Sequence, residues 1–359
     1  MSILDLIRPE LKSVTNYQSL GDTLTTRLHA NELPWQPVKV PGINLNHYPD
    51  VRRQQELQER LATNYQVNPE QLLVTRGSDD GIDLLMRLFL TPGQDSILQC
   101  PPTFSMYAFY AQIQNAKVIN CPLEEEQGFN LSLDKLIAAW NPICKIIMLC
   151  RPNNPTGNLL DLDSVSSICN AFTGKAIVVV DEAYIEFSDA PSAASLISRF
   201  ENIVVLRTLS KAYGLAGLRL GCLIAQAPII TALQSIMAPY LIPSPILEIA
   251  LRALKDKSWF TSTIRKIINS REQLINALQQ SRLLDEIYPS RSNFVLVKSR
   301  HALGVARWFA EHDMAVRSFA GHPLLDSMLR ITVGSDEQNT KLITLLANYS
   351  AKADNLRLG

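Results

Sequence analysis

One lysine of this chain stands among side chains that suit covalent chemistry. Lys211 follows the apolar run 203–206, which predicts a buried strand. Proteins with alternating strands and helices place their ligands at the carboxyl ends of such strands. Thr208 and Ser210 precede the lysine, and Arg219 follows it among glycines that let a ligand approach the backbone. A lysine that can form a Schiff base, beside hydroxyls and an arginine that can hold a phosphate, indicates pyridoxal phosphate as the cofactor.

A carboxylate follows a second apolar run. Residues 176–180 are mostly β-branched, which is typical of a strand covered on both faces, and Asp181 comes directly after them. Asp181 could pair with the ring nitrogen of the cofactor and keep it protonated, so that the ring withdraws electrons. The alternative is that Asp181 only caps a helix, because Asp is favoured at that position.

A rigid loop follows a third run. Residues 145–150 predict another buried strand, and Pro152 and Pro155 fix the loop that carries Asn154. Asn154 could donate a hydrogen bond to the phenolate oxygen of the cofactor, and Tyr184 could donate a second. An Asn-Pro turn without any ligand is the alternative.

A glycine-containing turn at residues 75–81 opens a helical pattern that runs to residue 89. Ser78 and Asp79 stand at the expected helix start, where free N–H groups bind phosphate. The turn lacks the Gly-Lys-Ser/Thr ending of a Walker A loop, and it lacks the Rossmann glycine pattern. Because the carboxyl ends of parallel strands meet at one edge of a sheet, the four segments predict a single ring of ligands.

These motifs together resemble those of the fold-type I aminotransferases, the aspartate aminotransferase superfamily. Its three central motifs occur in the family's order and spacing, as Asn153-Asn154-Pro155-Thr156-Gly157, Asp181-Glu182-Ala183-Tyr184 and Ser210-Lys211 followed by Arg219. Within the superfamily the chain is similar to the histidinol-phosphate aminotransferases, on the strings His29-Ala30-Asn31-Glu32, His47-Tyr48-Pro49-Asp50, Cys100-Pro101-Pro102-Thr103-Phe104 and Leu329-Arg330-Ile331-Thr332-Val333-Gly334. The resemblance covers nearly the whole chain.

The resemblance implies an α/β fold in which a large domain, built on a mainly parallel seven-stranded sheet flanked by helices, is joined to a smaller α/β domain. Residues 1–30 would form an N-terminal arm that joins the small domain or the dimer contact. Residues 31–245 would form the large cofactor-binding domain, and residues 246–359 the small C-terminal domain.

The resemblance also implies roles for individual residues. Lys211 would hold the cofactor and then move the proton, with Asp181 and Tyr184 as the other catalytic residues. The cofactor would be bound by these three and by Ser78, Asp79, Phe104, Asn154, Thr208, Ser210 and Arg219. Phe104 stands where the family often has a Tyr that stacks on the ring, and stacking needs only a ring face. Tyr48 would reach the phosphate from the other subunit, which implies a homodimer.

The substrate-binding residues implied by the resemblance are Tyr17, Asn31, Arg317 and Arg330. Arg330 matches the arginine that binds the carboxylate of glutamate, while Arg317, Arg330 and Tyr17 match the positions that hold a substrate phosphate. A surface arginine is the alternative for Arg317.

The implied reaction is the transamination of histidinol phosphate with 2-oxoglutarate, which gives imidazole-acetol phosphate and glutamate in histidine biosynthesis. On the same fold, an aromatic or broad amino-acid aminotransferase and a threonine-phosphate decarboxylase are alternatives. A ligand-sensing regulator usually carries a basic DNA-binding segment, and nothing in the sequence looks like one. A Ser210–Lys211 hydrolase would leave Asn154 and Asp181 unexplained.

Composition excludes several other classes. The 359 residues include 34 basic and 34 acidic side chains, and this balance argues against nucleic acid or a membrane surface as partner. No apolar run approaches the roughly 20 residues that span a bilayer. The five histidines show no metal-ligand spacing, so no metal is expected. Six cysteines without a Cys-x-x-Cys pair, and no secretory leader, indicate a cytoplasmic protein.

Overall fold

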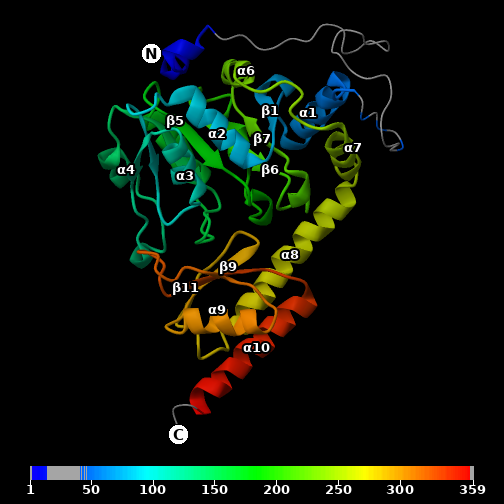
Figure 1. Cartoon of the computed structure of the whole chain (residues 1–359). Helices are drawn as coiled ribbons and strands as arrows, with labels where there is room; N and C mark the ends of the chain where they lie inside the picture. The colour runs from blue at the N-terminus through cyan, green and yellow to red at the C-terminus, as the bar shows by residue number, and fades with distance from the viewer. Residues whose placement is uncertain (1, 14–40, 42, 44, 46, 356–359) are drawn as a thin grey trace.

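The computed structural model describes residues 2–13, 41, 43, 45 and 47–355. Tyr17 and Asn31, two of the expected substrate-binding residues, lie outside the described residues. The described chain forms a large lobe around a seven-stranded sheet and a small lobe around a four-stranded sheet (Figure 1).

The sheet of the large lobe is mainly parallel, as expected. In spatial order its strands are β1 (Leu72–Thr75), β7 (Gly221–Ile224), β6 (Ile203–Thr208), β5 (Ile177–Asp181), β4 (Cys144–Cys150), β2 (Ser96–Gln99) and β3 (Lys117–Asn120). The strands from β6 to β3 run parallel, and β7 runs antiparallel to both of its neighbours. The carboxyl ends of β4, β5 and β6 therefore lie side by side, which is where the sequence places its candidate residues.

Both faces of this sheet are covered, which explains the continuous apolar runs. In β5, Ile177 and Val179 belong to one core cluster, whereas Val178 and Val180 belong to the other, and all four are 0% exposed. The first cluster includes side chains of α2 (Ser78–Phe89), α3 (Met106–Ile113) and α6 (Ala227–Ser235). The second includes side chains of α1 (Val51–Tyr65), α4 (Leu133–Ala139), α5 (Leu162–Ala171) and α7 (Ser244–Ala253).

The small lobe holds an antiparallel sheet in the order β10 (Arg317–Ser318), β11 (Met328–Thr332), β9 (Phe294–Lys298) and β8 (Glu286–Ile287). Its core is shared with α8 (Lys257–Leu278), α9 (Ala302–Glu311) and α10 (Asp336–Asn355). The long helix α8 runs from the large lobe down to this sheet (Figure 1). Asp256 caps the start of α8 by accepting a hydrogen bond from Trp259 N at 2.9 Å, so α8 is separate from α7.

Short 3-10 helices complete the described elements: η1 (Ile3–Leu6), η2 (Pro9–Leu11), η3 (Pro69–Gln71), η4 (Glu125–Gln127), η5 (Ile185–Phe187), η6 (Ala193–Leu196) and η7 (Ala216–Leu218). The first two pack on the large lobe, where Ile3 and Ile7 are buried with side chains of α2. A contact of the N-terminal arm with the small domain or a partner stays a prediction, and so does the division of the chain at residues 30 and 245.

Candidate active site

Lys211 lies in the loop that follows β6, close to the end of β5. Its Nζ is 5.7 Å from the ring centre of Tyr184. The residue is exposed, yet the protein around its ammonium removes enough water to lower its pKa, and the positive charge of Arg330 lowers that pKa further. A lowered pKa leaves more of the amine neutral, which is the form that attacks a carbonyl carbon.

Asp181 is the last residue of β5, and its side chain is buried, with 2% exposed. The carboxylate accepts hydrogen bonds from Tyr107 Oη at 2.7 Å and from Ala183 N at 3.1 Å. Burial raises the pKa of Asp181 to about 6, so the carboxyl group is mostly ionised at neutral pH. Neither of its two hydrogen-bond donors is a cation. A buried anion that lacks a cation fits the protonated ring nitrogen of pyridoxal phosphate.

An anion cradle forms where β7 meets the start of α2. Gly77 precedes α2 with φ +83°, and a Cβ at Gly221 would lie 2.7 Å from Ser78 N, so only glycine permits this approach. The guanidinium of Arg219 lies against the same turn, with Nη2 3.1 Å from Asp79 Oδ2. Free N–H groups at a helix start and an arginine together fit the phosphate of the cofactor.

The two expected hydroxyls join this cradle. Ser210 Oγ is 3.4 Å from Nη1 of Arg219, and Ser210 N donates to Thr208 Oγ1 at 3.1 Å. The structure therefore brings together the five residues of one subunit for which phosphate binding is predicted: Ser78, Asp79, Thr208, Ser210 and Arg219.

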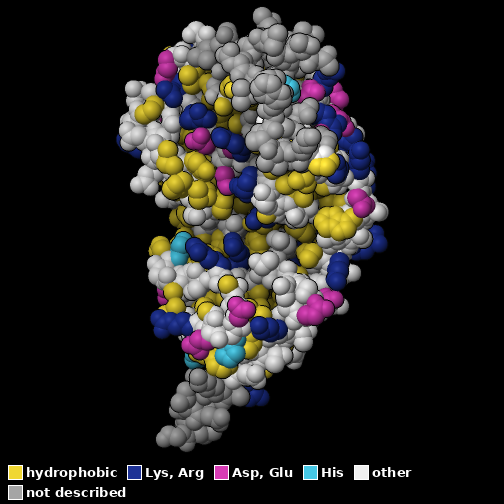
Figure 2. Space-filling model, turned by 45° about the vertical axis from the view of Figure 1, so that its right-hand side comes forward, with side chains coloured by type: hydrophobic (Ala, Val, Ile, Leu, Met, Phe, Trp, Pro, Cys, Tyr) yellow, Lys and Arg dark blue, Asp and Glu magenta, His cyan; other side chains and the backbone are white. Residues whose placement is uncertain are grey.

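The two arginines expected to bind substrate lie opposite each other in the small lobe. Arg330 Nη1 donates a hydrogen bond to Asn154 Oδ1, which links the small lobe to the loop after β4. Arg317 is directly opposite Arg330 in the pairing of β10 with β11. Desolvation lowers the pKa of Arg330, and the charge of Arg317 adds to this effect. Like charges placed opposite each other are destabilising unless an anion binds between them. Figure 2 shows Lys and Arg side chains on both sides of the hollow between the lobes.

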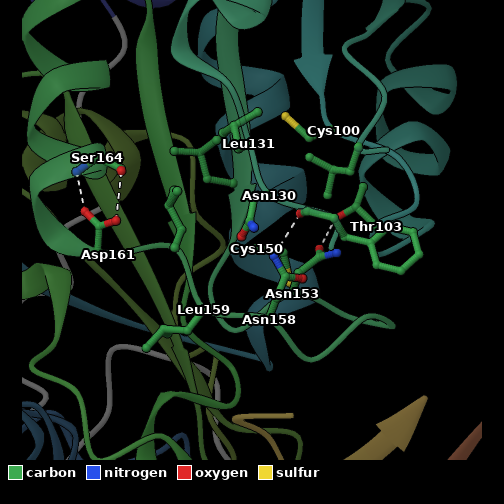
Figure 3. A pocket seen from close by; sticks show the side chains of 14 residues that line it. Cys100, Thr103, Asn130, Leu131, Cys150, Asn153, Asn158, Leu159, Asp161 and Ser164 are labelled. Atoms are coloured by element: carbon green, nitrogen blue, oxygen red, sulfur yellow. Dashed lines mark hydrogen bonds between the residues drawn. The ribbon is translucent and has the colours of Figure 1, made fainter. Parts of the chain in front are cut away.

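The loop with Asn154 is held by a set of hydrogen bonds. Asn153 Nδ2 donates to Pro102 O at 2.9 Å, and Thr103 Oγ1 donates to Asn153 Oδ1 at 2.9 Å. Thr103 and Asn153 are among the residues that line a pocket of about 180 Å³ (Figure 3). Their hydrogen bonds join the segment before Phe104 to the loop that carries Asn154. The ring of Phe104 meets Tyr107 edge-on, with centroids 5.6 Å apart.

Tyr107 has no signal in the sequence, whereas Tyr48 is expected to act from a second subunit. Tyr107 lies within the short apolar helix α3, and only the fold brings its hydroxyl to Asp181, 74 positions away. Tyr48 is 49% exposed and stacks on Tyr240, with ring centroids 4.5 Å apart.

Two further observations concern the described residues alone. No group of three or more His, Cys, Asp or Glu side chains there is placed to hold a metal ion. In the same part of the chain, no helix is both long and apolar enough to cross a bilayer.

The fold and the site together define a pyridoxal-phosphate enzyme, and comparison with known proteins agrees. The model of the family "Aminotransferase class I and II" matches residues 28–346. Histidinol-phosphate aminotransferase 1 of Legionella pneumophila (strain Lens) is 53% identical over 351 residues, which cover 98% of this chain and 96% of that protein.

Solved structures share the fold. The histidinol-phosphate aminotransferase of Clostridium acetobutylicum superposes with a TM-score of 0.78 at 21% identity, over 86% of this chain and 92% of that one. That of Sinorhizobium meliloti, in complex with pyridoxal-5'-phosphate, gives 0.76 at 23% identity, over 85% and 84%. The chain belongs to the class I and II aminotransferases. It is a pyridoxal-phosphate-dependent aminotransferase, which confirms the expected fold class, enzyme class and cofactor.

The buried charge of Asp181 predicts a stability effect in the cofactor-free protein. The pKa is about 6 in the folded state and near 3.8 when unfolded, so the free energy of unfolding falls as pH rises from about 4 through about 6. The shift corresponds to about 3 kcal/mol at neutral pH. We expect apo Asp181→Asn to melt above the apo wild type at pH 7.5, with a smaller difference at pH 5. Equal melting temperatures at both pH values, measured by calorimetry, would contradict the assignment of a raised pKa.

Proposed function

We propose that the enzyme transfers the amino group of L-histidinol phosphate to 2-oxoglutarate, giving imidazole-acetol phosphate and L-glutamate in histidine biosynthesis. The observation that carries this proposal is the cross-strand pair of Arg317 and Arg330, with Arg330 bonded to Asn154. The name of the Legionella relative, which is 53% identical over nearly the full chain, supports the same substrate.

In this proposal, each end of the cofactor is held by a different part of the large lobe. The start of α2 holds the phosphate with Thr208, Ser210 and Arg219. Asp181 pairs with the ring nitrogen, while Asn154 and Tyr184 bond the phenolate oxygen and Phe104 packs on the ring face. When bound, pyridoxal phosphate supplies the electron-withdrawing ring that makes the proton on the substrate Cα removable.

Lys211 acts as the base and the acid. Its Nζ, with a pKa lowered by desolvation, would remove the proton from the substrate Cα and, once protonated, would return it during the transfer. The second substrate, 2-oxoglutarate, requires the same proton transfers by Lys211 in reverse order. Tyr184 lies close enough to Lys211 to help orient its amine.

One pocket must accept two different anions. Arg330 can bind the carboxylate of glutamate through two parallel hydrogen bonds, because a guanidinium matches a carboxylate in shape. A phosphate carries more oxygens and more charge, so Arg317 and Arg330 bind it together, with Tyr17 as a further contact. Asn31 is proposed as another substrate-binding residue.

The active unit is proposed to be a homodimer in which Tyr48 reaches the cofactor phosphate of the partner subunit. Support comes from its exposed position beside Tyr240 on the large lobe. Sedimentation of the holoenzyme as a monomer, with full activity, would contradict this arrangement.

Removal of Arg317 is expected to slow the reaction of histidinol phosphate much more than the reaction of glutamate. A hydrogen bond to a charged group contributes about 1.5–3 kcal/mol, so Arg317→Ala should lower kcat/KM for histidinol phosphate roughly 10–100-fold. The half-reaction with glutamate should fall much less, because Arg330 alone can bind a carboxylate. Single-turnover absorbance of the cofactor measures both half-reactions in one preparation.

The control for this experiment is Arg307→Ala, which removes an exposed arginine from α9 and should change neither half-reaction. If Arg317→Ala lowers both half-reactions equally, Arg317 supports the small lobe and does not select the substrate. If phenylalanine or tyrosine reacts faster than histidinol phosphate in the wild type, the enzyme is an aromatic aminotransferase. Release of CO₂ from a phosphorylated amino acid would indicate a decarboxylase.

A further inference from the structure

Four charged side chains form a cluster of ion pairs beside the strand ends of the site, and none of them has a part in the proposed reaction. They are Arg151, Glu182, Glu186 and Arg207. Arg151 is 1% exposed and Glu182 0%. The two cations balance the two anions. Because buried charges are tolerated only when paired and hydrogen-bonded, the loss of one member leaves another uncompensated.

Glu182 is the centre of this cluster. Its Oε1 accepts hydrogen bonds from Arg151 Nη1 at 2.7 Å and from Ala193 N at 2.8 Å. Its Oε2 accepts from Ser192 Oγ at 2.5 Å and lies 3.5 Å from Arg207 Nη1. One carboxylate therefore joins an arginine that follows β4 to an arginine within β6.

These residues are next to the candidate site in sequence but on the other side of the strands. Glu182 follows Asp181, and successive side chains of an extended chain point in opposite directions. Arg151 begins the loop that carries Asn154, and its N donates to Asp181 O at 2.8 Å. Arg207 belongs to β6, whose end leads into the loop of the candidate lysine.

We infer that Glu182 is a positioning residue, which through its two arginine partners locks the ends of β4, β5 and β6 together and so holds the cofactor-facing side chains in place. Ordinary ladder hydrogen bonds also join these strands, but β4 and β6 are not neighbours in the sheet. The cluster is a side-chain link that spans all three. The inference rests on the proposed cofactor site and is independent of the substrate.

Glu186 provides a matched control. Its Oε1 accepts from Arg207 Nη2 at 2.8 Å, and its side chain is 9% exposed. Glu186→Gln therefore removes the same charge from the same cluster as Glu182→Gln does. The difference is that Glu186 pairs with the arginine of β6, whereas Glu182 joins β6 to the loop after β4.

The test uses apoenzyme titrated with pyridoxal phosphate. Three quantities are measured for each variant: the apoenzyme melting temperature, the cofactor Kd, and the pH midpoint of the visible absorbance of the bound cofactor. In Glu182→Gln we expect the Kd to rise about 10–100-fold, as when residues that orient metal-binding side chains are lost. We expect the pH midpoint of the bound cofactor's visible absorbance to move by at least about 0.5 pH units in this variant. In Glu186→Gln the melting temperature should fall by a similar amount, while the Kd and the midpoint stay near those of the wild type.

Equal changes in Kd and midpoint for the two variants, or unchanged values in Glu182→Gln with a lowered melting temperature, would overturn the inference. If Glu182→Gln does not fold, Arg151→Lys decides the question. This variant keeps the charge but loses the bond from Arg151 Nε to Leu160 O at 2.6 Å and the forked geometry of the guanidinium. It should also weaken cofactor binding, and an unchanged Kd and midpoint would refute the link. A wild type that binds the cofactor at a lysine other than Lys211 would refute the proposed site instead.

Discussion

Lys211→Ala is expected to abolish turnover while leaving the protein folded. The side chain is exposed and lies in a loop, so its removal opens no cavity in the core. The variant loses both the covalent attachment of the cofactor and the group that moves the proton. General acid–base catalysis alone contributes roughly 10²–10⁴-fold, so the loss of both should exceed 10⁴-fold. Single-turnover absorbance with excess histidinol phosphate measures the remaining rate.

Lys211→Arg is the matched variant for this prediction. It keeps a positive charge within the influence of Arg330 and Asp79, but a guanidinium forms no Schiff base and stays protonated at any working pH. It should be as inactive as Lys211→Ala. A rate near that of the wild type in Lys211→Arg would mean that the lysine contributes only charge, and the assignment would be wrong.

Asp181→Asn is expected to bind the cofactor and to lower kcat by roughly 10²–10³-fold, the usual cost of removing one fixed electrostatic group from a reacting centre. The carboxamide fits the same space and can still accept the hydrogen bond from Tyr107, but it cannot hold the ring nitrogen protonated. The fold should be retained, because removing a buried anion raises the stability of the cofactor-free protein. The rate is measured in the same single-turnover assay.

Tyr107→Phe distinguishes the effect of the hydrogen bond to Asp181 from the effect of the Asp181 charge. This variant removes the hydroxyl that donates to Asp181 at 2.7 Å and keeps the anion itself. We expect a loss of about tenfold or less, since one hydrogen bond is removed and not the charge. If Asp181→Asn retains nearly full kcat with the cofactor bound, Asp181 only caps the chain after β5 and the proposed contact with the ring does not exist.

Much of this site could be predicted from the sequence because its residues follow buried strands directly. Lys211, Asp181 and Asn154 each come after an apolar run, and parallel strands bring such positions to one edge of the sheet. The mainly parallel seven-stranded sheet was implied by the resemblance to fold-type I aminotransferases, and the structure has such a sheet.

The remaining features depend on long-range packing that has no local pattern. Tyr107 lies in an apolar helix, and nothing in its neighbourhood signals a hydrogen bond to a residue 74 positions away. Arg317 and Arg330 lie opposite each other because of the register of β10 with β11. The nine residues between these strands contain no simple pattern that predicts this register. Glu182 and Arg151 are in motifs that the sequence singles out, but their pairing with each other becomes visible only in the fold.

Reduction with borohydride shows which lysine carries the cofactor, and we expect it to be Lys211 at the edge of the large sheet. The holoenzyme is treated with borohydride, digested, and mapped by mass spectrometry for the cofactor-modified peptide. We expect a single modified residue, Lys211, and no such modification in Lys211→Ala treated in the same way. Modification of a different lysine, or of none in a holoenzyme that is active, would contradict it.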